Sequence, residues 1–324
     1  MRAMPESSRV VVLDPGFRLD AVKEALVPLG FEVEFSDRVP SGSGIVGILA
    51  CTDVPVVGSD LAAMPDLKAV ATPSVGLDHL PLGEAAELGI WVSNVPDFCT
   101  SEVADTTIGL ILALRRGIAQ FDRSVRSGEW NWEAAGELRR LEGSTLGLVG
   151  FGRIGQAVAR RAAAFGLEIW ASDPGLLPAD IANAGARPCS FEDLIAGCAI
   201  ISLHAPMRPD DGPLVSAAEL RAMRSDAILV NASRGGLVDL SALLAALETG
   251  EIAGAGLDVL PEEPPADGAP RHDRLLITPH AAWFSREAEE AAFREPIAAM
   301  VAVLSGSRPA PEVTVVEGTA VASS

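Results

Sequence analysis

The chain has 324 residues, which is enough for two domains of ordinary size. Hydrophobic residues make up 48% and charged residues 21%, a balance typical of a folded globular protein and not of a disordered one. The formal net charge of −19 excludes nucleic acid and anionic lipid as expected partners, because such a surface repels both. A local arginine can still bind an anionic substrate.

Two further classes are excluded by local patterns. No uninterrupted apolar run reaches the length of about 18 residues that a membrane span requires, and the polar N-terminus is not a secretory signal. The cysteines, Cys51, Cys99, Cys189 and Cys198, form no CxxC pair and no metal-ligand spacing, so no metal is expected. Free thiols suit a reducing compartment, and we expect a cytoplasmic protein, with a reactive thiol at Cys99 left open.

The first hundred residues alternate short apolar runs with helical stretches. A helix is expected over residues 19–29, where Gly30 ends it. Strands are expected over residues 10–13, 31–35, 45–50, 69–72 and 90–93. Alternating strands and helices of this kind predict a parallel sheet with helices on both faces.

A long apolar helix and a polar segment come next. Residues 101–116 are apolar over much of the helix surface, a pattern of helices that are buried between domains or packed against another subunit. Residues 123–140 are more polar and contain Trp130 and Trp132. We expect this segment to be a connecting excursion that takes part in a dimer contact.

From residue 145 the alternation restarts and ends in a long helix. Strands are expected over residues 145–149, 167–171, 199–203, 227–231, 254–259 and 275–278. The final helix runs to about residue 304, and a polar tail follows. Because this helix can return to the first set, we predict an α/β protein with two doubly wound parallel-sheet domains. The substrate domain is then discontinuous, over residues 1–100 and 285–324, and the nucleotide-binding domain covers residues 101–284.

The segment Gly150-Phe-Gly-Arg-Ile-Gly155 joins a predicted strand to an alanine-rich helix. Gly150 allows a tight turn, Gly152 lets backbone N–H groups approach a pyrophosphate, and Gly155 lets the helix pack on the strand. Asp173 ends the next predicted strand, where it can accept hydrogen bonds from a ribose. A bare glycine motif is often only a turn, but this complete context predicts dinucleotide binding. Asp173 would repel a 2′-phosphate, which favours NAD over NADP.

Polar residues follow three later strands, at the place where open parallel sheets bind ligands. They are Arg234, Glu263 and His280. Hydride transfer to a ketone needs a cation for the substrate, a proton donor and a carboxylate that orients the donor, and these are the residue types required. Each also has a simpler interpretation: a turn arginine, a solvated loop glutamate and a structural histidine. Next to a nucleotide fold, we interpret them as one catalytic set.

The chain resembles the D-isomer-specific 2-hydroxyacid dehydrogenase family over nearly its whole length. The resemblance rests on residues 148–159, on Asn231-Ala-Ser-Arg-Gly-Gly-Leu-Val-Asp239, on Gly254-Ala-Gly-Leu-Asp-Val259 with Glu263-Pro264, and on Thr278-Pro-His-Ala-Ala282. It implies a flavodoxin-like substrate domain, an inserted Rossmann domain that binds NAD, and a homodimer built on the inserted domain. It also implies that Arg234, Glu263 and His280 are the catalytic residues.

Further site residues follow from the same resemblance. Val75 and Gly76 lie in a loop whose backbone N–H groups hold the substrate carboxylate. Asp258 faces the nicotinamide carboxamide, and His204 ends a strand and can line the cofactor. The remaining residues assigned to the cofactor are Thr107, Gly150, Gly152, Arg153, Ile154, Gly155, Asp173, Pro206, Ala232 and Ser233.

The segment His280-Ala-Ala-Trp-Phe-Ser285 is similar to the C-terminal-binding-protein corepressors, which share this fold and bind NAD(H). That similarity places Trp283 beside the substrate side chain, although packing alone could also account for it. Thr72 stands where many relatives have an arginine, so the expected pocket lacks a second cation. Val75 stands where phosphite-oxidising relatives have a lysine, and formate-oxidising relatives differ around the histidine, so neither substrate is favoured.

Two functions are compatible with these features. The leading hypothesis is an NAD-dependent oxidoreductase that interconverts a small 2-oxo acid and its D-2-hydroxy acid, with His280 as the proton donor. The alternative is an NAD(H)-sensing, corepressor-like binding protein with weak or vestigial dehydrogenase activity. The complete catalytic set favours the enzyme. His79 and His272 have no comparable set of partners and are expected at the surface or in loops.

Overall fold

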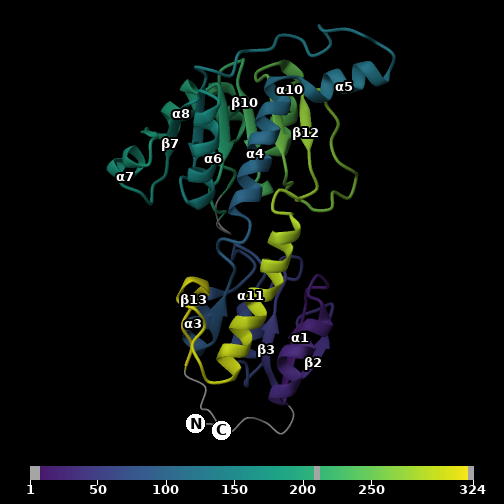
Figure 1. Cartoon of the computed structure of the whole chain (residues 1–324), viewed down its shortest axis with the longest axis vertical. Coiled ribbons are helices and arrows are strands. Elements are labelled where there is room, and N and C mark those ends of the chain that lie inside the picture. Colours follow the sequence, from purple (N-terminus) through teal and green to yellow (C-terminus); the bar gives the residue numbers. More distant parts are fainter. Residues whose placement is uncertain (1–7, 208–211, 320–324) are drawn as a thin grey trace. The chain divides into compact units, whose positions relative to one another are not determined.

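The structure, a computed structural model, describes residues 8–207 and 212–319. The chain forms two compact units: Met1–Phe98 and Ser285–Ser324 make unit 1, and Cys99–Phe284 make unit 2. Each unit contains its own sheet, with helices packed on both faces (Figure 1).

Unit 1 is built on a six-stranded sheet with the order β13-β5-β4-β3-β1-β2. Its strands are β1 (Arg9–Val12), β2 (Glu32–Phe35), β3 (Ile45–Leu49), β4 (Ala69–Ala71), β5 (Trp91–Ser93) and β13 (Thr314–Val316). Strands β1 to β5 are parallel. The order of these five is the flavodoxin-like one.

Helices cover both faces of this sheet because its central strands are apolar on both sides. Val10 and Val12 pack into one core and Val11 into the other, since successive side chains of a strand point to opposite faces. Helices α1 (Leu19–Leu26) and α11 (Arg286–Leu304) cover the first face, and α2 (Gly58–Ala62) and α3 (Leu82–Leu88) cover the second. Short 3-10 turns lie at Val27–Leu29 and Pro311–Val313.

The end of the chain differs from the expected polar tail. Residues Thr314–Val316 form β13, which is antiparallel to β5 and adds an edge strand to the otherwise parallel sheet. All three residues are only half-buried, as suits an edge strand, and the run Val313-Thr-Val-Val316 consists of the β-branched residues that favour strands. This local signal was overlooked in the expected polar tail, whereas the antiparallel pairing with β5, which is distant in the sequence, could not be read from it.

Unit 2 contains a seven-stranded sheet with the order β12-β11-β10-β9-β6-β7-β8, in which all neighbours are parallel. The strands are β6 (Thr145–Val149), β7 (Glu168–Ser172), β8 (Arg187–Pro188), β9 (Ile200–Leu203), β10 (Ile228–Asn231), β11 (Gly254–Leu257) and β12 (Leu275–Ile277). This is the Rossmann order, with its switch point between β6 and β9. The expected α/β fold, with a Rossmann unit inserted into a discontinuous unit, is confirmed.

Two helical layers cover the unit 2 sheet. On one face lie α4 (Thr100–Arg115), α6 (Arg153–Ala164) and α7 (Pro178–Asn183), and on the other α8 (Phe191–Gly197), α9 (Ala217–Ala222) and α10 (Leu240–Thr249). Helix α5 (Ile118–Arg126) follows α4, and a 3-10 turn lies at Gly235–Leu237. Along the described parts of the chain, no helix has the length and apolar character needed to cross a bilayer.

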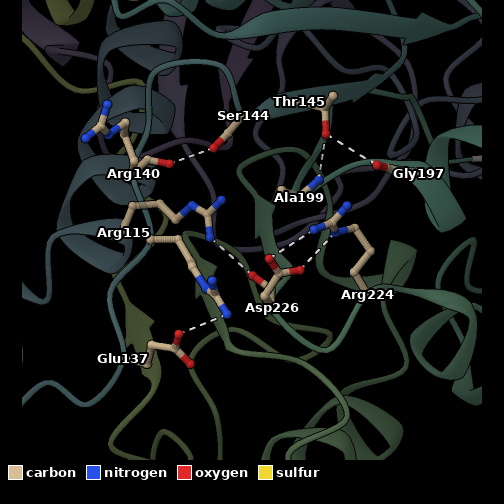
Figure 2. A network of polar contacts seen from close by, with 10 residues as sticks. Arg115, Glu137, Arg140, Ser144, Thr145, Gly197, Ala199, Arg224 and Asp226 are labelled. Atoms are coloured by element: carbon tan, nitrogen blue, oxygen red, sulfur yellow. Dashed lines mark hydrogen bonds and ion pairs between the residues drawn. The ribbon is translucent and has the colours of Figure 1, made fainter.

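A buried arginine lies at the edge of the unit 2 sheet where the strands begin (Figure 2). The Arg115 side chain is 5% exposed, and its Nη1 donates to the Asp226 carbonyl oxygen over 3.1 Å. The Asp226 carboxylate accepts two hydrogen bonds from Arg224, of 2.8 and 3.1 Å. These bonds from Arg224 lower the pKa of Asp226, whereas burial lowers the pKa of Arg115. Asp226 therefore neutralises part of the charge around a buried guanidinium.

We expect Asp226→Asn to lower the free energy of unfolding by about 1–2 kcal/mol at neutral pH, because charge-assisted hydrogen bonds are lost. The pKa of Asp226 is lower in the folded chain, so its contribution is complete above the ordinary value of 3.8. That contribution is lost as the pH falls through the lower folded-state value. Urea unfolding of wild type and variant at pH values near 7 and near 3 measures both effects.

Asp122→Asn is the matched control, because Asp122 forms an exposed ion pair with Arg126 on α5. Exposed pairs contribute little, so this variant should unfold nearly as wild type does. A stability difference between wild type and Asp226→Asn that widened toward acid pH would contradict the assignment.

Candidate active site and cofactor-binding loop

All seven strands of the unit 2 sheet run in the same direction, so their carboxyl ends form one edge. The glycine segment follows β6, Asp173 follows β7 and His204 follows β9. Arg234, Asp258 and His280 follow the adjacent strands β10, β11 and β12. The structure therefore brings these predicted strand-end residues to one edge, which includes the switch point where such sheets bind ligands.

The glycine loop has the shape that a dinucleotide requires. Gly150 has φ of +88°, and a Cβ on it would lie 2.4 Å from the His204 carbonyl oxygen, so only glycine fits. A Cβ on Gly155 would lie 2.5 Å from the Gly150 carbonyl oxygen, which lets α6 pack closely on the turn. Gly152, by contrast, faces open space at the N-terminus of α6. This open cradle at a helix N-terminus, followed by Arg153 and Ile154, suits a pyrophosphate.

Asp173 connects the end of β7 to the glycine loop. Its Oδ2 accepts a hydrogen bond of 2.7 Å from the Phe151 N–H, and its Oδ1 accepts one of 2.8 Å from the Gly175 N–H. The carboxylate is thus held by backbone on two sides. A carboxylate fixed beside the loop is placed to accept hydrogen bonds from a ribose and to repel a 2′-phosphate.

His204 has its ring inside unit 2. Its Nε2 lies 2.9 Å from the Ser202 hydroxyl, and its Nδ1 is buried without a hydrogen-bond partner among the described residues. Burial lowers the pKa of His204 to about 4, so the ring is neutral at physiological pH. Its backbone supports the loop more directly, because the His204 N–H donates to the Val149 carbonyl over 2.7 Å.

His280 and Glu263 form a close pair. The His280 Nδ1 lies 2.6 Å from the Glu263 Oε2. The Glu263 Oε1 accepts a hydrogen bond of 2.6 Å from the Leu260 N–H. A carboxylate only accepts, so the proton between the two side chains belongs to Nδ1. The Nε2 of His280 is then the nitrogen that can exchange a proton with a substrate.

Asp258 holds the turn that carries His280. Its side chain is 1% exposed, and its carboxylate accepts hydrogen bonds from the Thr278 hydroxyl at 2.5 Å and from the N–H groups of Ala281 at 3.0 Å and Ala282 at 2.9 Å. The His280 N–H donates to the Asp258 carbonyl over 2.7 Å. His280 itself has φ of +51°, which is unusual outside glycine. A buried carboxylate with three donors keeps this turn in place.

Arg234 lies in a turn that touches the loop before Glu263. The Asn231 Nδ2 donates to the Arg234 carbonyl over 2.8 Å, and the Arg234 Nη1 donates to the Ser233 carbonyl over 2.9 Å. A Cβ on Gly235 would lie 2.0 Å from the Leu260 carbonyl oxygen. Glycine at 235 therefore allows the Arg234 turn to approach the backbone segment that binds Glu263.

The other predicted cofactor residues of unit 2 have these contacts. Thr107 is buried and donates to the Val103 carbonyl of its own helix over 2.8 Å. Ser233 donates to the Leu203 carbonyl over 2.8 Å, which links the ends of β9 and β10. Pro206 is exposed, and Ala232 is half-buried beside Ser233. The Trp283 ring makes an edge contact with Phe284, with ring centroids 5.6 Å apart.

Val75 and Gly76 belong to unit 1, in the loop after β4. Three carbonyl groups of this loop accept hydrogen bonds. The Ser74 carbonyl accepts from the Val95 N–H over 3.2 Å and the Val75 carbonyl from the Asn94 Nδ2 over 2.9 Å. The Gly76 carbonyl accepts from the Ser74 hydroxyl over 2.7 Å. In a trans peptide the next N–H points the opposite way. The N–H groups of Val75, Gly76 and Leu77 are thus turned away from these partners, and successive backbone N–H groups of this kind can bind anions.

Two supporting residues were missed by the sequence reasoning. Asn231 caps the Arg234 turn with both ends of its amide, because its Oδ1 also accepts from the Ser233 N–H at 3.0 Å. Asp258 was assigned only to the nicotinamide, whereas its carboxylate holds the His280 turn. An asparagine at a strand end followed by Ala-Ser-Arg-Gly-Gly was the available signal for the first. No local signal existed for the second. No group of three or more metal-binding side chains occurs among the residues that the structure describes.

Comparisons with known proteins agree with this site. The family model described as "D-isomer specific 2-hydroxyacid dehydrogenase, NAD binding domain" matches residues 108–282. Glycerate dehydrogenase of Methylorubrum extorquens is 38% identical over 72% of this chain and 75% of its own length. Glyoxylate reductase of Thermococcus litoralis is 41% identical over 70% of each chain.

A solved structure extends the likeness to both units. The D-lactate dehydrogenase of Aquifex aeolicus, complexed with NAD and lactic acid, gives a TM-score of 0.86 at 25% identity, and the match covers 96% of this chain and 100% of that one. The family match confirms NAD as the class of cofactor. The chain belongs to the D-isomer-specific 2-hydroxyacid dehydrogenase family.

Proposed function

We infer that this chain is an NAD-dependent oxidoreductase that interconverts a small 2-oxo acid and its D-2-hydroxy acid. The observation that carries this conclusion is the His280–Glu263 pair, at 2.6 Å, on the same sheet edge as the glycine loop. The relatives support it, since they are a glycerate dehydrogenase, a glyoxylate reductase and a D-lactate dehydrogenase. They do not favour the alternative of a corepressor-like sensor.

When bound, NAD supplies the hydride acceptor or, once reduced, the hydride donor. We propose that Gly152, Arg153 and Ile154 hold its pyrophosphate and that Asp173 holds its ribose. Thr107, His204, Pro206, Ala232 and Ser233 stay predicted as further cofactor contacts, and Asp258 as a contact of the carboxamide.

We propose that His280 donates its Nε2 proton to the carbonyl oxygen of the substrate as that oxygen becomes an alcohol. Glu263 keeps the other nitrogen protonated and orients the ring, and Arg234 attracts the carboxylate and polarises the carbonyl. In oxidation the same nitrogen accepts the proton. The Asp258 hydrogen bonds support this role because they fix the backbone that follows His280 and the Thr278 side chain that precedes it.

On the substrate side, we propose that the backbone N–H groups of Val75 and Gly76 bind the carboxylate. The hydrogen bonds accepted by the Val75 and Gly76 carbonyls support this, because they hold these peptides with their N–H groups turned away from the bonded side. Trp283 stays predicted as a residue that contacts the substrate side chain.

A homodimer is proposed on the exposed aromatic residues of unit 2. Trp130 is 92% exposed and Trp132 is 82% exposed in the single chain, both after α5. Large aromatic side chains exposed to this degree, two residues apart in the sequence, are typical of an interaction surface. Sedimentation of wild type and of a Trp130→Ser, Trp132→Ser variant decides this, and a wild-type monomer would refute it. A cytoplasmic location stays a prediction.

The test of function is the oxidation of NADH, followed by absorbance, with a panel of 2-oxo acids. Glyoxylate, hydroxypyruvate, pyruvate, phenylpyruvate and a thioether-bearing 2-oxo acid differ in the size of the side chain. We expect clear turnover with at least one of them and a preference among them. Tight NADH binding without turnover on any member would instead support the sensor.

A further inference from the structure

The loop that carries Val75 and Gly76 is supported by a buried histidine. His79 was expected at the surface or in a loop; it lies in the loop between β4 and α3, but it is buried there, with 6% of the residue exposed. Its Nε2 lies 3.0 Å from the Thr72 hydroxyl oxygen, and Thr72 is fully buried. The Thr72 hydroxyl in turn lies 3.1 Å from the Ser74 hydroxyl, which donates to the Gly76 carbonyl over 2.7 Å.

The directions of these hydrogen bonds can be deduced from their donors. Ser74 has one hydroxyl proton, and the Gly76 carbonyl takes it, so the Ser74 oxygen must accept from Thr72. The single proton of Thr72 is then in use, and Thr72 must accept from the His79 Nε2. The order is therefore His79 to Thr72 to Ser74 to the Gly76 carbonyl. Bonds aligned in one direction polarise one another.

This order determines how one peptide of the loop faces. The Gly76 carbonyl is held toward Ser74, so the N–H of the same trans peptide, that of Leu77, is turned to the opposite side. In the preceding peptide, the Asn94 side-chain amide holds the Val75 carbonyl, so the Gly76 N–H is turned away from Asn94. Within the described residues, the N–H groups of Val75, Gly76 and Leu77 donate no hydrogen bond.

We propose that His79 and Thr72 are positioning residues of the substrate site, and that the Leu77 N–H is a third carboxylate donor beside those of Val75 and Gly76. The proposal rests on the proposed function and deepens it. Thr72 here uses its hydroxyl to shape the loop and contributes no charge to the substrate. Unit 1 then binds the substrate carboxylate through peptide N–H groups and without a charged side chain, and the cation is Arg234 of unit 2. This suits a substrate with one anionic group.

Thr72→Val removes the hydroxyl at nearly constant volume, and His79→Leu removes the Nε2 donor. We expect each to raise the KM for the preferred 2-oxo acid by about tenfold, because hydrogen bonds to a charged carboxylate are weakened. The kcat and the KM for NADH should change little, since the carboxylate is bound equally in the ground and transition states. Calorimetric titration of the NADH complex with oxamate, which is not reduced, should show the same loss of affinity.

Conservative variants separate positioning from mere folding. Thr72→Ser keeps the hydroxyl, and His79→Gln places an amide nitrogen near the position of Nε2, so both should restore the KM. The double variant Thr72→Val, His79→Leu should be no worse than either single variant, because both break one chain of hydrogen bonds. Thr314→Val is the matched control, since it removes a hydroxyl bond to the Ala310 carbonyl elsewhere in unit 1.

The outcomes distinguish this inference from the proposed function. Wild-type turnover with an unchanged KM and oxamate affinity in both disrupting variants would overturn the inference and leave the function standing. A parallel loss of melting temperature, kcat and NADH affinity without rescue would show a structural role only, which also overturns it. A wild type that reduces no 2-oxo acid would overturn the proposed function, and this inference with it.

Discussion

His280→Asn is expected to lower turnover by at least about a hundredfold while NADH still binds, because the proton donor is lost and the cofactor cradle is untouched. Asparagine is preferred over alanine as the replacement, since His280 has φ of +51° and asparagine tolerates that conformation. The measurement is steady-state turnover with the preferred 2-oxo acid, together with the NADH dissociation constant from fluorescence quenching.

His272→Asn is the matched control for this experiment. His272 also belongs to unit 2, and its Nε2 lies 3.9 Å from the carboxylate of Glu248. Its variant should turn over substrate nearly as wild type does. Turnover that survived in His280→Asn would remove His280 from the mechanism, and equal losses in both variants would indicate a general effect of removing a histidine.

Asp173→Ala is expected to weaken NADH binding by about tenfold or more and to reduce the preference for NADH over NADPH. Two causes act together. The carboxylate that would accept from the ribose hydroxyls is lost, and so are the acceptors of the Phe151 and Gly175 N–H groups that shape the loop. Removing the negative charge also removes the repulsion of a 2′-phosphate. The dissociation constants of NADH and NADPH measure both effects.

Asp180→Ala provides the comparison, because Asp180 is an exposed acid in the first turn of α7, shortly after Asp173. It should bind both cofactors as wild type does. If Asp173→Ala left both dissociation constants unchanged, the carboxylate would have no part in cofactor choice. A loss for NADH with no gain in relative NADPH affinity would limit its role to shaping the loop.

Local patterns were sufficient for most of unit 2 and for the parallel part of unit 1. The glycine loop could be predicted because the requirement for glycine is local: Gly150 has positive φ, and Gly155 lies against the carbonyl of Gly150 itself. Arg234 and His280 could be predicted as neighbours of one sheet edge because parallel strands place their carboxyl ends together. The antiparallel pairing of β13 with β5 and the burial of His79 could not, since both depend on contacts between segments.

The sequence by itself determined the α/β class, the Rossmann unit, the cofactor and the family, because strand periodicity, turn glycines and strand-end residues act over a few positions. The tertiary structure alone decided that Glu263 lies 2.6 Å from His280, that Asp258 holds the His280 turn, and that His79 reaches Thr72. Hydrogen-bond distances and burial depend on how separate segments pack. The supporting residues of the site are therefore visible only once the chain is folded.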